Sequence, residues 1–301
     1  MSITEFRAPK GPLAGIERAR SAVRGRMDAL VDRALGEDAA RRLAAVRDAE
    51  GGEVDPFGFD PAVARYAVVV ARWLYRHWFR AEVFGIENVP DGRVLLISNH
   101  SGQLPLDGMA IASALLLDRT PPRFVRSMVE RWTATLPFVS EFFPRVGQIV
   151  GVPENCLRLL EMDEAILVFP EGSRGISKTF PNRYRLTEFG SGFMRLALQT
   201  RTPIVPVAVI GAEEQYISLT DLKRVAKLLG MPALPVMPQL LIPGGFLPLP
   251  TRYRIHFGEP LRFQGDPDDE DAVIEEKVAV VRATVQSMVN RGLKERPAIF
   301  W

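Results

Sequence analysis

Short apolar runs alternate with stretches of helical periodicity from residue 93 onward, and this alternation restricts the possible folds more than any other feature. Runs rich in β-branched and aromatic residues predict strands over 93–98, 122–129, 164–170, 202–211 and 252–258. Helices between and beyond them are expected over 107–117, 154–163, 188–200 and 219–229. The pattern predicts an α/β fold in which a central, largely buried mixed sheet is flanked by helices. In such a fold, reactive residues belong at the carboxyl ends of the strands.

Residues 1–59 are predicted to form a basic helical extension ahead of a larger domain that spans 60–301. The extension holds one or two arginine-rich helices over 13–47, interrupted near Gly36, and then the linker "EGGEVDPFGFD". Near the other end of the chain, acidic residues at 266–271 begin an amphipathic helix, where they complement the helix dipole.

The first helix of the larger domain is expected over 61–82, with Asp60 as its N-cap, Pro61 in its first turn and Gly85 after its end. Four arginines fall within an arc of about 80° on one side: Arg65, Arg72, Arg76 and Arg80. Such a helix either lies in a membrane interface, with its arginines toward lipid phosphates, or packs its aromatic face on the protein core. The arginines interrupt it too often for a transmembrane span.

The segment 228–250 contains no charged residue and six prolines. The prolines exclude a continuous helix, and they therefore also exclude a transmembrane helix. The segment is either an apolar surface that touches lipid or an acyl chain, or a proline-rich connection that covers the core.

Composition excludes several classes of protein. A formal charge of +2 over 301 residues is too small for a typical nucleic-acid-binding protein. A single cysteine, Cys156, rules out an intrachain disulfide, and three histidines with one cysteine argue against a zinc cluster. The first 20 residues lack an apolar run typical of a signal peptide, so we expect a cytoplasmic, reducing location.

A histidine and an aspartate follow the first predicted strand of the sheet, in "LLISNHSGQLPLDG". His100 can take a proton near neutral pH if one ring nitrogen is free and a partner fixes the other. Asp107 is the nearest carboxylate and could orient the imidazole and stabilise its charged form. A histidine after a strand can also be purely structural.

A second cluster stands at the end of another predicted strand, in "ILVFPEGSRG". Pro170 and Gly172 bring Glu171, Ser173 and Arg174 to a turn where the backbone can approach a ligand closely. The Arg174 guanidinium suits a phosphate or a carboxylate. The alternative is an ordinary turn with a surface ion pair between Glu171 and Arg174.

In this order, these pieces resemble the glycerolipid acyltransferase superfamily, whose best-known members are the 1-acylglycerol-3-phosphate acyltransferases. The first block of that superfamily, Asn-His with a downstream Asp, matches Asn99, His100 and Asp107. Its Phe-Pro-Glu-Gly-x-Arg block matches 169–174, and its late Val-Pro-Val strand matches 205–207. The resemblance covers about residues 85–260.

The chain departs from the usual pattern in two places. Six residues separate His100 from Asp107 where four are usual, so the loop must take a different path if the two side chains meet. The usual second block, which partly sets acceptor contacts, is poorly matched, and Arg145 is a substitute for its basic residue. Residues 232–259 are similar to a bacterial branch related to diacylglycerol-acyltransferase-like proteins, so neutral acceptors stay open alongside phosphorylated ones.

The resemblance implies an O-acyltransferase that moves a fatty acyl group from an acyl-CoA or acyl-carrier-protein thioester to a lysophospholipid or related glycerolipid. The thioester is already activated, so the reaction needs no metal, cofactor or protein nucleophile, and Cys156 is expected to be a small buried residue. His100, oriented by Asp107, would deprotonate the acceptor hydroxyl. Backbone donors at Ser101 and Gly102 could stabilise the oxyanion, and Arg174 would hold the acceptor head.

The same resemblance places the protein on the cytoplasmic face of a membrane, docked through the helix at 61–82. Two other classes stay open: a hydrolase that uses water as acceptor, and a non-catalytic lipid-binding protein on the same fold.

Overall fold

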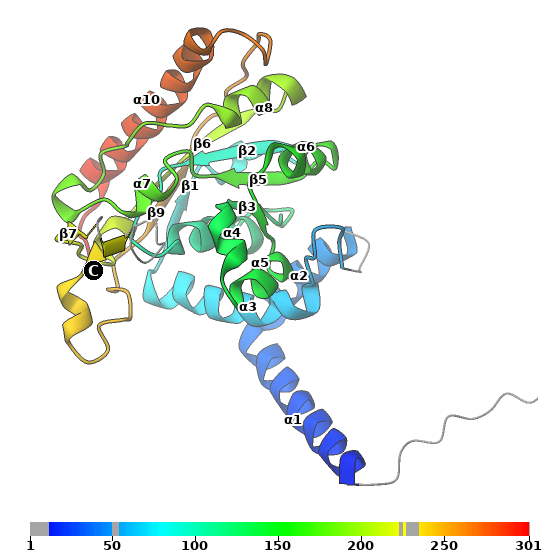
Figure 1. The fold of residues 1–301 in the computed structure, drawn as a ribbon. Helices are drawn as coiled ribbons and strands as arrows, with labels where there is room; N and C mark the ends of the chain where they lie inside the picture. Colours follow the sequence, from blue (N-terminus) through cyan, green and yellow to red (C-terminus); the bar gives the residue numbers. More distant parts are fainter. Residues whose placement is uncertain (1–11, 50–53, 223–224, 227–234, 301) are drawn as a thin grey trace, which may run out of the picture.

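The computed structural model of the chain describes residues 12–49, 54–222, 225–226 and 235–300 (Figure 1). Its centre is a seven-stranded sheet with the strand order β1-β9-β6-β2-β5-β3-β4. The strands are β1 (Glu82–Phe84), β2 (Val94–Ser98), β3 (Arg126–Val129), β4 (Gln148–Val150), β5 (Ala165–Val168), β6 (Ile204–Ile210) and β9 (Arg254–Phe257). Neighbouring strands are parallel except β6 and β9, so the predicted mixed sheet is confirmed.

Helices cover both faces of this sheet (Figure 1). One face carries α2 (Glu37–Ala49), α3 (Pro61–Trp73) with its π-helical continuation η1 (Leu74–Trp78), and α4 (Leu106–Leu117). The other carries α6 (Pro153–Glu161), α8 (Gly192–Thr200) and α10 (Asp271–Glu295). The remaining elements are α1 (Pro12–Leu35), η2 (Ile86–Asn88), η3 (Arg131–Thr135), α5 (Val139–Arg145), α7 (Ser173–Ile176), η4 (Phe180–Asn182), η5 (Ala212–Glu214), η6 (Pro238–Leu241) and the small ribbon β7 (Thr220–Asp221) with β8 (Pro235–Val236).

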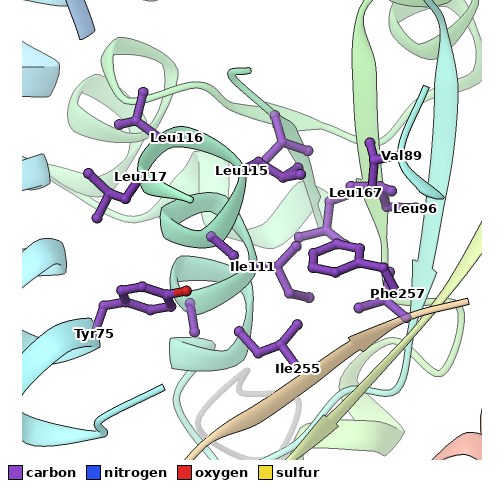
Figure 2. Close-up of a cluster of buried hydrophobic side chains, with 14 of the residues drawn as sticks. Tyr75, Val89, Leu96, Ile111, Leu115, Leu116, Leu117, Leu167, Ile255 and Phe257 are labelled. Carbon is purple, nitrogen blue, oxygen red and sulfur yellow. The ribbon is translucent and has the colours of Figure 1, made fainter. Parts of the chain in front are cut away.

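Strand β2 is buried along its whole length because both of its faces meet apolar helices. Side chains alternate across a strand, so Leu95 and Ile97 enter the core beneath α6 and α8, while Leu96 enters the core beneath α4. Figure 2 shows Ile111 and Leu115 of α4 directed toward Leu96 in that second core. This two-sided burial explains why the strand reads as an uninterrupted apolar run.

The N-terminal helices are joined at Gly36, whose φ of +75° suits glycine, and the predicted interruption there is confirmed. Helix α2 is more than an appendage, because Ala39, Leu43 and Val46 are buried in the core that α3 and α4 share.

The basic helix is shorter than predicted and its arginines face protein. Helix α3 passes into η1 and ends at Trp78, and β1 begins at Glu82. Its arginines contact other parts of the chain: Arg65 pairs with Asp28 and Asp32, Arg72 donates to the Ala34 carbonyl, Arg76 pairs with Asp118, and Arg80 donates to the Pro250 and Phe300 carbonyls. The arginines of the basic face are therefore largely engaged in ion pairs and hydrogen bonds within the protein.

Two other expectations are corrected. The helix expected over 219–229 does not begin there, since 220–221 form strand β7; residues 223–224 and 227–229 lie outside the described part. The described part of the uncharged segment, 235–250, includes η6 and an exposed loop, and so does not simply cover the core. Among the described helices, none combines the length and apolar character that crossing a bilayer requires.

Candidate active site

His100 and Asp107 are in direct contact at the carboxyl end of β2. The His100 Nδ1 and an Asp107 carboxylate oxygen are 2.9 Å apart. His100 lies two residues beyond the end of the strand, and Asp107 lies in the first turn of α4. The loop between them therefore returns on itself despite its extra length.

Two tight turns take up the additional residues of this loop. Gly102 has a φ of +86°, and its carbonyl accepts from the Leu104 N–H; the Leu104 carbonyl in turn accepts from the Leu106 N–H. Leu104 is thereby pushed outward and is exposed. A Cβ on Gly102 would lie 2.1 Å from the Gln215 Nε2, so glycine is required here for space as well as for its dihedral angle.

Asp107 is fully buried and accepts hydrogen bonds that hold it as a fixed acceptor. The Ser101 N–H donates to it at 2.9 Å and the Gly108 N–H at 2.8 Å, in addition to the His100 ring. When Nδ1 donates its proton to Asp107, the lone pair of the neutral imidazole is on Nε2. This arrangement suits a general base.

His100 is packed against two neighbours, one at its ring and one at its Cβ. The Phe169 ring stacks on it, with centroids 4.0 Å apart. Gly175 lies so close that a Cβ there would come within 2.7 Å of the His100 Cβ. The ring therefore has little freedom to rotate away from Asp107.

Glu171 joins the His100 loop to the rest of the site. It is buried, and it accepts from the His100 N–H at 3.0 Å and from the Thr187 N–H at 2.8 Å. Lys178 pairs with it at 3.2 Å and also pairs with Glu213 at 3.1 Å. Burial raises the pKa of Glu213 to about 7, although Lys178 opposes that shift.

Arg174 reaches solvent beside this buried cluster. Gly172 makes the turn with a φ of +57°, and the following Ser173 N–H donates to Glu130 at 2.7 Å. The Arg174 side chain is 56% exposed and donates to the Glu188 carbonyl at 3.0 Å. The alternative interpretation of this turn, a surface ion pair between Glu171 and Arg174, is therefore wrong, because Glu171 is buried and bonded elsewhere.

Several known proteins are similar to this chain. The Acyltransferase family matches residues 80–210. An uncharacterized protein of Mycobacterium tuberculosis is 39% identical over 257 residues, covering 82% of this chain and 72% of that protein. One of Mycobacterium leprae is 40% identical over 256 residues, covering 82% and 70%. The chain belongs to the glycerolipid acyltransferase superfamily.

More distant similarities agree with this assignment. A chicken protein named as a DGAT1/2-independent enzyme synthesizing storage lipids is 26% identical, with 73% of this chain and 62% of that protein covered. The crystal structure of the 1-acyl-sn-glycerophosphate acyltransferase from Thermotoga maritima matches with a TM-score of 0.52 at 18% identity, covering 86% of this chain and 88% of that one. The second match shows a shared fold.

In this acyltransferase, some of the groups predicted to contact substrate instead make hydrogen bonds within the protein. The Asn99 side chain both donates to and accepts from the Val209 backbone of β6, so it ties two strands together. The Ser101 N–H donates a hydrogen bond to Asp107 and is therefore unsuited to stabilise an oxyanion. The Gly102 N–H makes no hydrogen bond with another described residue and stays the candidate donor.

Arg145 is not brought to this site. It ends α5, just before β4 begins, whereas His100 follows the end of β2. Since β2, β5, β3 and β4 are parallel, Arg145 precedes the amino end of β4, whereas His100 follows the carboxyl end of β2, three strands away in the sheet. The acceptor contact predicted for it has no support in this geometry.

The acyltransferase site also contains residues that the sequence did not single out. Lys178, Thr187 and Gln215 come from loops and Glu213 from the short helix η5, with no recognisable spacing, and Lys178 resembles any surface lysine in the sequence. The Glu-Glu pair at 213–214, directly after an apolar strand, was the one available signal.

Cys156 is buried against Met128, and burial raises the pKa of its thiol to about 11. The thiol therefore stays protonated and is a poor nucleophile near neutral pH. An apolar cavity of about 200 Å³ lies nearby, where the ends of β3 and β4 meet η3 and α5; its lining includes Val129, Ala134, Phe143 and Val150.

Proposed function

We propose that this acyltransferase moves a fatty acyl group from acyl-CoA or acyl-carrier-protein to a hydroxyl of a lysophospholipid or related glycerolipid. The observation that carries the proposal is the 2.9 Å contact between His100 and Asp107, which directs the Nε2 lone pair away from the carboxylate. Membership of the superfamily gives the reaction class, and this contact gives a base for it.

The reaction proceeds in two proton transfers. His100 Nε2 takes the proton of the acceptor hydroxyl as its oxygen attacks the thioester carbonyl. The tetrahedral intermediate then expels the thiolate, which receives the proton from His100, so an ester and a free thiol result. Asp107 stabilises the imidazolium between these steps. The Gly102 N–H is the donor that we propose for the oxyanion, since it has no acceptor among the described residues.

Acceptor binding is assigned to the exposed arginine. Arg174 donates to the Glu188 carbonyl and pairs with the Glu188 carboxylate at 3.6 Å, but it is 56% exposed, so its guanidinium can also take a phosphate. Glu171, Gly172 and Ser173 hold the turn that presents it. The apolar cavity near Val129 is a candidate for the acyl chain. A neutral acceptor would make less use of Arg174.

We further propose that the protein is peripheral on the cytoplasmic face of the membrane, where the lipid acceptor resides. The exposed apolar side chains of the described surface support this location, while the arginines of α3 are mostly occupied.

The test is a transfer assay with radiolabelled acyl-CoA or acyl-carrier-protein, and with lysophosphatidate or monoacylglycerol as acceptor. His100→Ala should lower the rate by about 10²–10⁴-fold, as expected for loss of a general base. His77→Ala, which changes an exposed histidine on η1, is the matched control.

The alternatives give different products. Release of free fatty acid at an undiminished rate without acceptor would assign a hydrolase. Lipid binding with neither product would assign a non-catalytic binding protein. Transfer by His100→Ala at the parental rate would exclude the base mechanism.

A further inference from the structure

We propose that the apolar loop, residues 238–247, is the element that inserts into the lipid surface beside the active site. This inference rests on the proposed function, which requires a lipid-borne acceptor. The loop, rather than the arginine face of α3, would then determine the orientation of the active site at the membrane surface.

The loop exposes large apolar side chains to solvent. Leu241 is 87% exposed, Phe246 70% and Ile242 62%, with Leu240 and Leu247 about half exposed. No charged residue occurs anywhere in 228–250. In Figure 1 the loop, drawn in yellow, projects from the end of the molecule near β7. A projecting apolar group of this kind marks an interaction site.

The backbone of the loop offers few hydrogen-bond donors to a partner. Prolines at 238 and 243 in the loop, and at 248 and 250 just after it, have no N–H. The N–H groups of Leu240, Ile242, Gly245 and Leu247 each donate to the carbonyl three residues earlier in the chain. Protein interfaces normally carry about one hydrogen bond per 100–200 Å², whereas hydrocarbon carries none. A backbone with most of its donors removed or satisfied suits lipid.

The loop is fixed to the loop that carries His100. The Gln215 Nε2 donates to the Gly102 and Leu104 carbonyls, at 2.8 and 3.1 Å. The Gln215 carbonyl accepts from Leu249 N–H at 2.8 Å and from Gln239 Nε2 at 3.3 Å, so both ends of the apolar loop are attached to this residue. Insertion of the loop would therefore bring Leu104 and the His100 loop toward the lipid surface.

Aromatic residues extend the same surface. The Trp78 indole N–H donates to the Pro248 carbonyl at 3.0 Å, and Trp73 stacks on Trp78 with half of its surface exposed. Tryptophan is favoured at the boundary between headgroups and hydrocarbon. Because Arg76 pairs with Asp118 and Arg80 donates to carbonyls, the attraction to lipid should be apolar and nearly independent of salt.

The test uses an environment-sensitive fluorophore on Leu241→Cys. Cys156 is buried, so the parent treated with the same reagent should stay unlabelled. Val280→Cys, on α10 and 51% exposed, is the matched control. Each labelled protein is mixed with vesicles of phosphatidylcholine alone, or with phosphatidylglycerol added, at low and high salt.

A blue shift at position 241 but not at 280, persisting at high salt and in phosphatidylcholine alone, is the expected result. Sedimentation with vesicles should fall at least tenfold in a Leu241→Asp, Phe246→Asp double variant and stay unchanged in Val280→Asp.

Three outcomes would overturn the inference. These are vesicle binding without a shift at 241, no vesicle binding at all, or a shift that needs no vesicles and follows protein concentration, which would assign the loop to a second copy of the chain. None of these readouts uses acyl transfer. A failure of the proposed reaction would therefore leave the insertion result readable, and the converse also holds.

Discussion

Two polar clusters hold His100, and they are assembled in different ways. The first is local: Asp107 contacts the imidazole and the Ser101 and Gly108 N–H groups, all within nine residues of chain from 100 to 108. The second is long-range: Glu171 accepts from the His100 N–H and pairs with Lys178, which also pairs with Glu213 on η5, the helix that follows β6. The first therefore sets the proton chemistry of the ring, and the second sets where its backbone lies.

The difference separates two kinds of damage. A change in the local cluster should reduce catalysis and leave the fold intact, because only the ring and its orienting carboxylate are affected. A change in the long-range cluster should reduce stability, because it leaves charges buried without partners.

The largest effect is expected for Asp107→Asn. The amide preserves size but removes the charge that stabilises the imidazolium, and it can present an NH₂ group that favours the wrong tautomer. The turnover rate should fall by about 10³-fold, with little change in KM. Transfer kinetics and a thermal melt measure the two properties. A rate within threefold of the parent would exclude an orienting role for Asp107.

Lys178→Met should mainly unfold the protein. The lysine side chain is 6% exposed and lies within 3.2 Å of both Glu171 and Glu213. Removing one partner of a buried ion pair costs about 3–5 kcal/mol, measured here by denaturant unfolding. Adding Glu213→Gln to Lys178→Met should recover part of that loss. If the double variant were less stable than the single one, the assumed pairing would be wrong.

Glu213→Gln should change how stability depends on pH. The carboxyl has a folded pKa of about 7 against an ordinary value of 4.5, because it is buried. Its raised pKa stabilises the fold fully below about pH 4.5, and this contribution is lost as pH rises through 7. The parent should lose up to about 3 kcal/mol across that window from this group, and the glutamine variant should not. If the unfolding free energies of the parent and of Glu213→Gln changed with pH at the same slope, this prediction would be contradicted.

The same contrast explains what the sequence could predict. The central strands are apolar runs buried on both faces, and a motif contained within a few residues, such as His100 with Asp107, keeps its spacing in the sequence. The alternation of strands and helices therefore gave the fold class. Short edge strands such as β1 and β4, of three residues each, carry too little periodicity to be recognised.

Long-range partners leave no such pattern. The four arginines between residues 65 and 80, on α3, on η1 and just after it, form a regular basic stripe, which the sequence pattern associates with lipid phosphates. In the structure, Arg65 pairs with Asp28 and Arg76 pairs with Asp118, carboxylates that are 37 and 42 residues away in the sequence. Lys178 and Gln215 are likewise recognised only once the loops that carry them are packed together. A charge pattern on one helix does not say which charges face it.

The smallest effect is expected where the two clusters meet. The Gln103 Nε2 donates to the Lys178 carbonyl at 3.0 Å, and so connects the loop between His100 and Asp107 to the loop that carries Lys178. Gln103→Ala should cost about 1 kcal/mol of unfolding free energy, the usual value of one hydrogen bond, and lower the turnover rate only slightly. Combined with Lys178→Met in a double-mutant cycle, it should show a coupling energy above about 0.5 kcal/mol, because the two changes act on the same loop. Combined with Val280→Ala on α10, it should be additive. Additivity with both would mean that the clusters support His100 independently.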